Sequence, residues 1–192
     1  MFTRGFKTWC ETVALQQRRT LKLQPTAPLD PGVLAASIGI EVRTLEEVPG
    51  LDDDVLHVLR GEGADSWSAV TLTDGAKSVI ILNSAHSVGR SASDLTHELA
   101  HLIIGHRPGR IDITEDGALM LHTYDRQQED EANWLAGCLL LPRLALLFIE
   151  RQGLDAASAA RLYGVSTPML QYRRQVTGVQ YQVRRGRSTA RR

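Results

Sequence analysis

Two histidines stand four residues apart in the stretch SDLTHELAHLIIGH, which covers Ser93–His106, and a glutamate directly follows the first of them. The residues around His97 and His101 are mostly apolar, which predicts a largely buried helix. Residues four apart lie on one face of a helix, so both imidazole rings can point at a single ion. Glu98 would flank that ion without having to bind it. The spacing therefore indicates a zinc site with an open position for water.

A simpler interpretation stays open at this point. Two helical histidines can be held by ordinary hydrogen bonds inside a core, and chance produces this pattern in roughly one of a hundred chains of this composition. His106, five residues beyond His101 and past Gly105, is expected to be a charge at the helix end rather than a ligand. A third ligand from elsewhere in the chain would favour the metal interpretation.

The best candidate for the third ligand is Glu129, in the stretch EDEANWLAGCLLLP. It follows His101 by 28 residues, which is enough for a loop and a return helix. Asn133 lies one turn later on the same face and could hydrogen-bond the outer nitrogen of a ligand histidine. Asp130 and Glu131 are the rival acids, but the first lies about 100° around the helix and the second is expected to point away.

The elements that must position these residues are helices and a short sheet. Asp74 and Gly75 lie between two β-prone runs, which is a strong hairpin signal. Ser91 or Ser93 can cap the motif helix, and Gly105 can end it. The other predicted elements are helices at about 6–19, 30–39, 50–61, 125–142 and 143–151, a strand at 40–44, and strands at 67–73 and 78–82 beside the hairpin.

The last part of the chain differs from the rest in charge. Residues 151–192 contain nine arginines and one acid, a net charge of +8, so residues 1–150 carry −8. Such an asymmetry suggests a second module or a charged partner. The tail at 184–192 has no apolar anchor and is expected to be disordered.

The stretch AARLYGVSTPMLQYRRQ predicts two helices joined by a tight turn, with Ser166 capping the second. This arrangement matches a helix-turn-helix pattern. If the pair binds DNA, Arg173 and Arg174 should contact it. If it docks a protein, the apolar residues Met169, Leu170 and Tyr172 should matter more. We expect a domain at 1–150, a helix-turn-helix-like module at 151–183 and the basic tail.

The two motifs in series resemble the ImmA/IrrE family of zinc metallopeptidases. That family joins an H-E-x-x-H helix to a later helix of the form E-x-x-A-N-x-F-A, which ends in Leu-Leu-x-Pro. The resemblance covers residues 28–178 and departs from the family at Ala100, where glycine is commoner, and at Leu135, where phenylalanine is usual. It implies an α+β fold: a zincin-like domain with a small antiparallel sheet, then the helix-turn-helix-like module.

The resemblance also implies a function. His97, His101 and Glu129 would hold Zn²⁺, with Asn133 behind a histidine, and Glu98 would act as general base and then general acid in peptide hydrolysis. The substrate would be a helix-turn-helix repressor, cleaved to relieve repression in mobile-element or stress regulation. The alternative is a DNA-binding or stoichiometric anti-repressor protein with a metal site that is not proteolytic.

His122 and Tyr124 are candidate donors to the oxyanion of that reaction. Both residues lie between the two ligand helices. A loop histidine and a half-buried tyrosine are the simpler interpretation of the pair.

Composition excludes several classes. The sequence contains no run of about 18 apolar residues, so we expect no membrane span. The N-terminal stretch does not look like a signal peptide. Cys10 and Cys138 are far apart in the sequence and match no zinc or redox spacing. We expect them to be reduced core thiols in a cytoplasmic protein.

Overall fold

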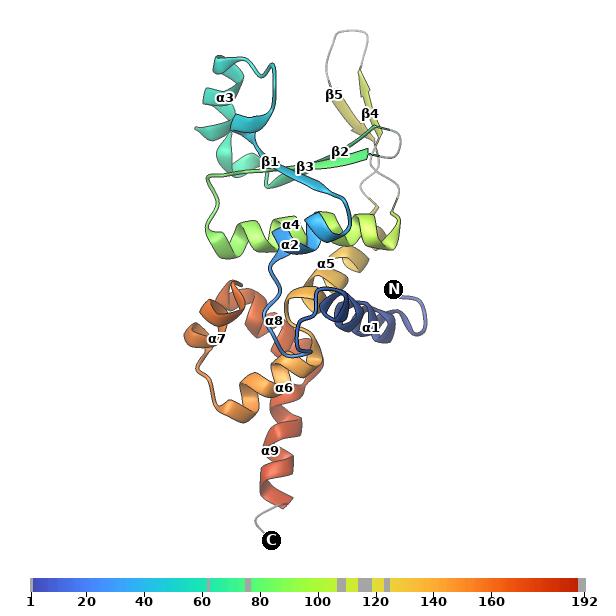
Figure 1. Cartoon of the computed structure of the whole chain (residues 1–192), viewed down its shortest axis with the longest axis vertical. Coiled ribbons are helices and arrows are strands. Elements are labelled where there is room, and N and C mark those ends of the chain that lie inside the picture. Colours follow the sequence, from blue (N-terminus) through green and yellow to red (C-terminus); the bar gives the residue numbers. More distant parts are fainter. Residues whose placement is uncertain are drawn as a thin grey trace.

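The computed structural model of the chain describes residues 2–61, 63–74, 77–106, 110–113, 119–122 and 125–189, and for 55, 74, 110–113, 119–122 and 187–189 it describes the backbone alone. In this part of the chain the fold is mixed and mostly helical. The helix α4 (Val88–Ile104) crosses the middle of the molecule, with a small sheet on one side and helices on the other (Figure 1). The motif histidines therefore lie on the helix that joins the two halves.

The bounds of the elements agree well with the periodicity of the sequence. The helices are α1 (Phe6–Thr20), α2 (Pro31–Ser37), α3 (Asp53–Arg60), α4 (Val88–Ile104), α5 (Arg126–Leu140), α6 (Arg143–Gln152), α7 (Ala156–Tyr163), α8 (Thr167–Thr177) and α9 (Val179–Thr189). The strands are β1 (Glu41–Thr44), β2 (Ala69–Asp74), β3 (Lys77–Leu82), β4 (Arg110–Ile113) and β5 (Leu119–His122). Two short 3₁₀ helices are at Leu45–Glu47 and Ala64–Ser66.

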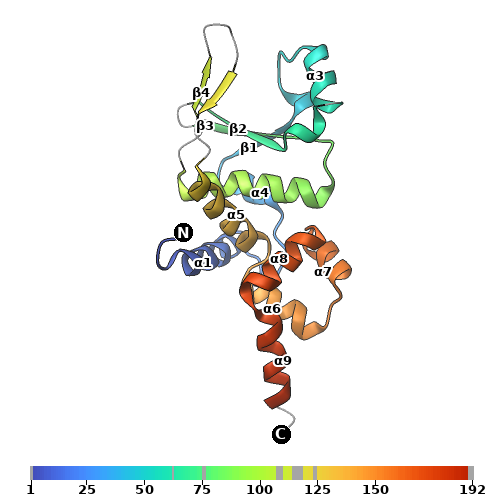
Figure 2. The same ribbon diagram turned by 180° about the vertical axis from the view of Figure 1, so that it is seen from behind.

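The main sheet has the order β1-β3-β2, with β2 at an edge. The predicted hairpin is confirmed as an antiparallel β2–β3 pair in which Asp74 is opposite Lys77. The expectation of a purely antiparallel sheet was wrong, because β1 pairs with β3 in parallel. The chain between β1 and the hairpin makes this possible, since α3 carries it back to the start of the hairpin (Figure 2).

The motif helix α4 begins earlier than the sequence predicted. Its N-cap is Ser87, whereas the Ser93 hydroxyl donates to the Gly89 carbonyl inside the helix. Gly105 ends the helix as predicted, in a left-handed conformation with φ of 80°. That turn reverses the backbone, and the amide of His106 donates to the His101 carbonyl at 3.0 Å.

Two clusters of buried apolar side chains hold the fold together. The first joins α1, α2, α4 and α5 with β3, and it includes Ala100 and Leu135, so both departures from the family pattern are packing positions. The second joins α6 to α9 and begins at Leu140, before the predicted domain boundary at 151. Several contacts also cross that boundary, such as the hydrogen bond from the Tyr163 hydroxyl to the Thr26 carbonyl at 2.6 Å.

One crossing contact is a close approach of backbones. A Cβ on Gly89, in the first turn of α4, would lie 3.1 Å from the carbonyl carbon of Val165 and from the amide nitrogen of Ser166. The absence of a side chain lets the α7–α8 turn rest directly on α4. The α7–α8 pair is thus packed against the motif helix.

The segment at 184–192 was expected to be disordered, but its described part, residues 184–189, is helical, and residues 190–192 lie outside the described residues. Helix α9 runs on to Thr189 and extends away from the rest of the molecule (Figure 1). Its start is anchored by Val179, which is fully buried, and by Gln182, which accepts a hydrogen bond from Arg143. Arginine and glutamine favour helix, so the anchored end propagates into the basic segment.

Among the described residues, no single helix is long and apolar enough to cross a membrane. Helices α5 and α6 would pass such a test only as a pair, and they are bent by 48° at the break between them. Both contribute to the buried clusters described above.

Candidate metal centre

The three predicted ligands converge on one point. His97 Nε2 lies 3.0 Å from His101 Nε2. Of the two carboxylate oxygens of Glu129, Oε2 lies 3.2 Å from His97 Nε2 and Oε1 lies 3.4 Å from His101 Nε2. Four ligands at about 2.0–2.2 Å around one ion in a tetrahedron would be about 3.3–3.6 Å apart. The observed separations are close to that spacing. The group fits a small divalent ion.

Helix packing explains the convergence. Helices α4 and α5 pack closely against each other, through buried residues such as Leu99 on α4 and Leu135 on α5. Asp125 caps α5, and its side chain accepts from the amides of Gln127 and Gln128. Glu129 follows in the first turn of α5, where the helix dipole favours a carboxylate.

The hydrogen bonds behind the ligands also favour a cation. Asn133 Oδ1 lies 3.1 Å from His97 Nδ1. This oxygen can only accept, so Nδ1 carries the proton and Nε2 of a neutral His97 is bare. Burial, followed by the charges of His97 and His106, lowers the pKa of His101 to about 4. Neutral His101 and the carboxylate of Glu129 add further lone pairs, and a cation is the partner that such a set requires.

Glu98 lies where the sequence placed it, beside the cluster rather than in it. It lines the same cavity as His97, Glu129 and Asn133, a cavity of about 410 Å³. Burial raises the pKa of Glu98, while the hydroxyl of Thr71, which donates to its carboxylate, acts in the opposite direction. The half-buried carboxyl is therefore a better proton acceptor than a fully exposed one. Thr71 comes from the edge strand β2, and nothing in the sequence pattern pointed to it.

His106 and Glu131 have contacts that the sequence did not predict. His106 Nδ1 lies 2.9 Å from His101 Nδ1, and His106 Nε2 lies 3.3 Å from Glu131 Oε2. His106 was expected to be a charge at the helix end, but it contacts His101 and Glu131 instead. Glu131 was expected to point away, yet only 13% of its side chain is exposed. The left-handed turn at Gly105 brings His106 back over the helix end, and spacing along an ideal helix cannot show this.

The two candidate oxyanion donors are not placed by the structure. Tyr124 lies outside the described residues, and His122 ends β5, of which only the backbone is described. Their role stays a prediction.

A larger groove adjoins the cluster of His97, His101 and Glu129. The two cavities share Ser93, Asn133 and Met169, and the second has a volume of about 910 Å³. Its remaining lining comes from the N-terminus, α4, α5 and the α8 region: Phe2, Ser87, Arg90, Asp130, Trp134, Ser166, Pro168 and Tyr172. Aromatic and apolar side chains therefore lead from α8 toward the cluster.

Arg173 and Arg174, which should contact DNA if the α7–α8 pair binds it, are turned inward. Arg173 is fully buried and pairs with Glu11 at 2.8 Å, and it also donates to the Leu141 carbonyl. Arg174 pairs with Glu150 at 2.6 Å and is mostly buried. The pattern of basic residues was read correctly, but their face of α8 packs on α5 and α6 instead of meeting solvent. Leu170, which should matter if the pair docks a protein, is also in the core.

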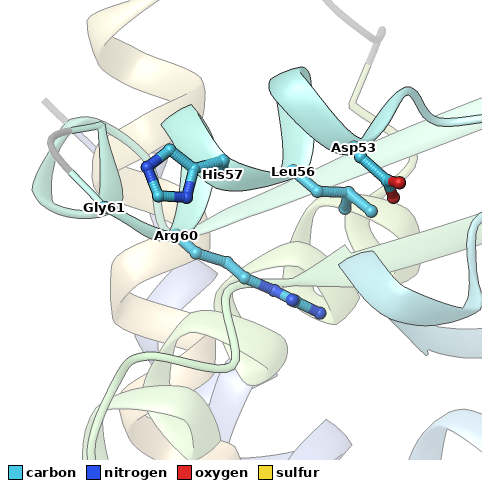
Figure 3. A pocket seen from close by; sticks show the side chains of 5 residues that line it. All are labelled: Asp53, Leu56, His57, Arg60 and Gly61. Carbon is cyan, nitrogen blue, oxygen red and sulfur yellow. The ribbon is translucent and has the colours of Figure 1, made fainter.

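A separate depression on α3 offers no comparable chemistry. It is lined by side chains from this helix and by its C-cap, as Figure 3 shows. Its cation, Arg60, is paired with Glu46. His57 and Asp53 also line the depression, but among the described residues they are not part of a group of three metal-ligating side chains.

The comparison with protein families agrees with this geometry. The model of the IrrE N-terminal-like domain, peptidase family M78, matches residues 55–174. No curated protein is a significant match to the chain. The matched segment contains the whole cluster, both ligand helices and most of α8, and it is more than half of the 192 residues. The chain therefore belongs to the IrrE N-terminal-like family of metallopeptidases, the ImmA/IrrE family.

Proposed function

We propose that the protein is a zinc-dependent endopeptidase that cleaves a helix-turn-helix transcriptional repressor. The observation that carries the proposal is the convergence of His97, His101 and Glu129 beside a half-buried carboxyl, Glu98. Two neutral imidazoles and one carboxylate, with space left for water, are the donor set of catalytic zinc sites. Family membership supports the peptidase activity, and the nature of the metal is part of the proposal.

The chemistry that zinc supplies in such a site is acidification of water and polarisation of a carbonyl. Glu98 accepts the proton of the attacking water and passes it to the leaving amine. Thr71 orients this carboxylate through its hydrogen bond. Asn133 holds His97 with its proton on Nδ1. No covalent intermediate with the protein is needed.

The substrate part of the proposal is supported by the groove beside the cluster. A protease that acts on a folded regulator must hold a segment of it in front of the metal. Met169 lines both cavities, and Tyr172 and Trp134 extend the apolar lining away from the cluster. We propose that α8 acts as a wall of the substrate groove. Because Arg173 and Arg174 are committed to internal ion pairs, this role accounts for α8 better than DNA binding does.

The test is incubation of the purified protein with the helix-turn-helix regulator encoded next to it, followed by electrophoresis and mass spectrometry of the fragments. We expect cleavage that a chelator abolishes and that added Zn²⁺ restores. Glu98→Gln keeps the shape and removes the base, so it should retain the metal and lose at least about 10²-fold in rate.

The competing function is a stoichiometric anti-repressor. It predicts that Glu98→Gln relieves repression of a reporter gene as well as wild type does. That result, with no fragment formed, would refute repressor cleavage as the biological role.

A further inference from the structure

The outer nitrogens of the two ligand histidines meet different partners. His97 meets the amide of Asn133, which the sequence predicted. His101 meets a second histidine, His106, which in turn meets a carboxylate, Glu131. The side chains of these last two residues are 7% and 13% exposed, so little water competes for them.

In the hydrogen-bonded series His101–His106–Glu131, the positions of the protons follow from the carboxylate of Glu131. The carboxylate oxygen of Glu131 only accepts, so the Nε2 atom of His106 that faces it at 3.3 Å carries a proton. A neutral His106 then has a bare Nδ1, and this atom accepts from His101 Nδ1 at 2.9 Å. With its proton on Nδ1, His101 has a bare Nε2, which is the atom that faces His97 and Glu129.

We propose that His106 and Glu131 are positioning residues that hold His101 in the tautomer and orientation of a metal ligand. The inference rests on the proposed metal site. A carboxylate commonly sets the tautomer of a ligand histidine directly, whereas here the carboxylate acts through an intervening imidazole.

Three local features hold this hydrogen-bonded series in place. Gly105 supplies the left-handed turn that returns His106 to the helix end. The Gln127 amide donates to the second oxygen of Glu131 at 3.0 Å and fixes that carboxylate from the far side. The rings of His101 and His106 meet edge to face, with centroids 4.9 Å apart. The contact therefore depends on a built turn and not on a chance rotamer.

The first experiment measures the dissociation constant of Zn²⁺ by competition with a chromophoric chelator. We expect His106→Ala to weaken binding by about 10–100-fold, and Glu131→Ala to weaken it by less. Glu131→Gln keeps an acceptor oxygen and should bind more tightly than Glu131→Ala. Asp130→Ala removes the same charge from the neighbouring, exposed position and serves as the control.

The decisive comparison is the double variant. Since Glu131 acts only through His106, adding Glu131→Ala to His106→Ala should cause no further loss of affinity. Additive losses would overturn the proposal, because they would mean that the two residues act independently. Thermal unfolding of each variant separates loss of affinity from loss of fold, and Glu131→Ala alone keeps the test available if His106→Ala does not fold.

Nitrogen NMR of the histidine rings gives a readout that is independent of affinity and of activity. In the zinc-loaded protein we expect the proton of His106 on Nε2 and a bare Nδ1. A proton on Nδ1 of His106 would refute the proposed direction. If wild type binds no Zn²⁺, the metal site itself fails and the inference fails with it. If wild type binds Zn²⁺ and His106→Ala binds it equally well, the positioning role alone is wrong.

Discussion

Helices α4 and α8 each carry polar residues on a face that packs against protein, and the outcome differs between them. On α4, His97 and His101 turn toward a carboxylate on α5, and the resulting cluster contains more lone pairs than protons. On α8, Arg173 turns toward a carboxylate on α1 and a backbone carbonyl, so its Nε and Nη2 donors meet acceptors, although its Nη1 has no hydrogen-bond partner among the described residues. A buried polar group that finds its complement in the chain stabilises the fold, whereas an excess of acceptors at one point indicates a site for a cation.

Removing a ligand from α4 or α5 should have the largest effect. We expect His97→Ala and Glu129→Ala each to lose most of the bound zinc and all measurable peptidase activity, because too few protein ligands remain. Metal analysis of the purified variants checks this. His57→Ala, an exposed histidine outside the cluster, is the control. Full zinc occupancy in both ligand variants would place the metal elsewhere.

Removing Arg173 from α8 should affect stability instead of DNA binding. Arg173→Ala removes the cation beside Glu11 and the side-chain donor to the Leu141 carbonyl, and we expect a loss of about 3 kcal/mol in the free energy of unfolding. Glu11 keeps the amide of Arg143 as a donor. This is the low end for a broken buried pair, because Glu11 is a quarter exposed. Chemical denaturation measures the effect.

The control for this change is Arg161→Ala, an exposed arginine on α7, which should stay within about 0.5 kcal/mol. If Arg173→Ala keeps normal stability but loses specific binding to duplex DNA, then Arg173 has a DNA-binding role and not a structural one.

Weakening the hydrogen bond behind His97 should have an intermediate effect. Asn133→Ala removes the acceptor of the Nδ1 proton, and we expect Zn²⁺ affinity to fall by about 10–100-fold with the fold intact. Titration with a competing chelator measures it. An unchanged affinity would mean that packing alone orients His97.

The apolar face of α8 should show the smallest effect, and only with a protein substrate. We expect Met169→Ala and Tyr172→Ala each to reduce kcat/KM for the repressor about tenfold, the value of one apolar side chain lost from a contact. Metal content should not change. Tyr181→Ala, on the exposed face of α9, is the control. Equal loss in all three variants would argue against a substrate groove at α8.

The sequence predicted the parts of the site that depend on local periodicity. The spacing of His97 and His101, and the single turn between Glu129 and Asn133, follow from helical geometry, and the structure brings all four side chains together. The same reasoning missed Thr71 and His106. The first reaches Glu98 from a strand 27 residues earlier, and the second through a left-handed turn.

The fold was predictable in its elements and less so in their arrangement. The cap at Ser166 and the end of α4 at Gly105 were predicted, and both are confirmed. The parallel pairing of β1 with β3 was not predictable, because it depends on where α3 returns the chain. The direction of Arg173 was hidden as well. It depends on Gly137, where a Cβ would lie 2.7 Å from the arginine's Cδ, so a glycine on one helix makes room for a side chain from another.

The contact at Gly89 has a consequence for the width of the groove. The α7–α8 turn rests on the backbone of α4 because one methyl group is missing there. The distance between α4 and the proposed substrate wall is therefore set by a backbone contact at the edge of the groove, where Ser166 both lines the groove and faces Gly89. A single carbon added at residue 89 would act as a spacer between the two walls, and substrate selectivity could be tuned from there without touching any residue that binds metal or moves a proton.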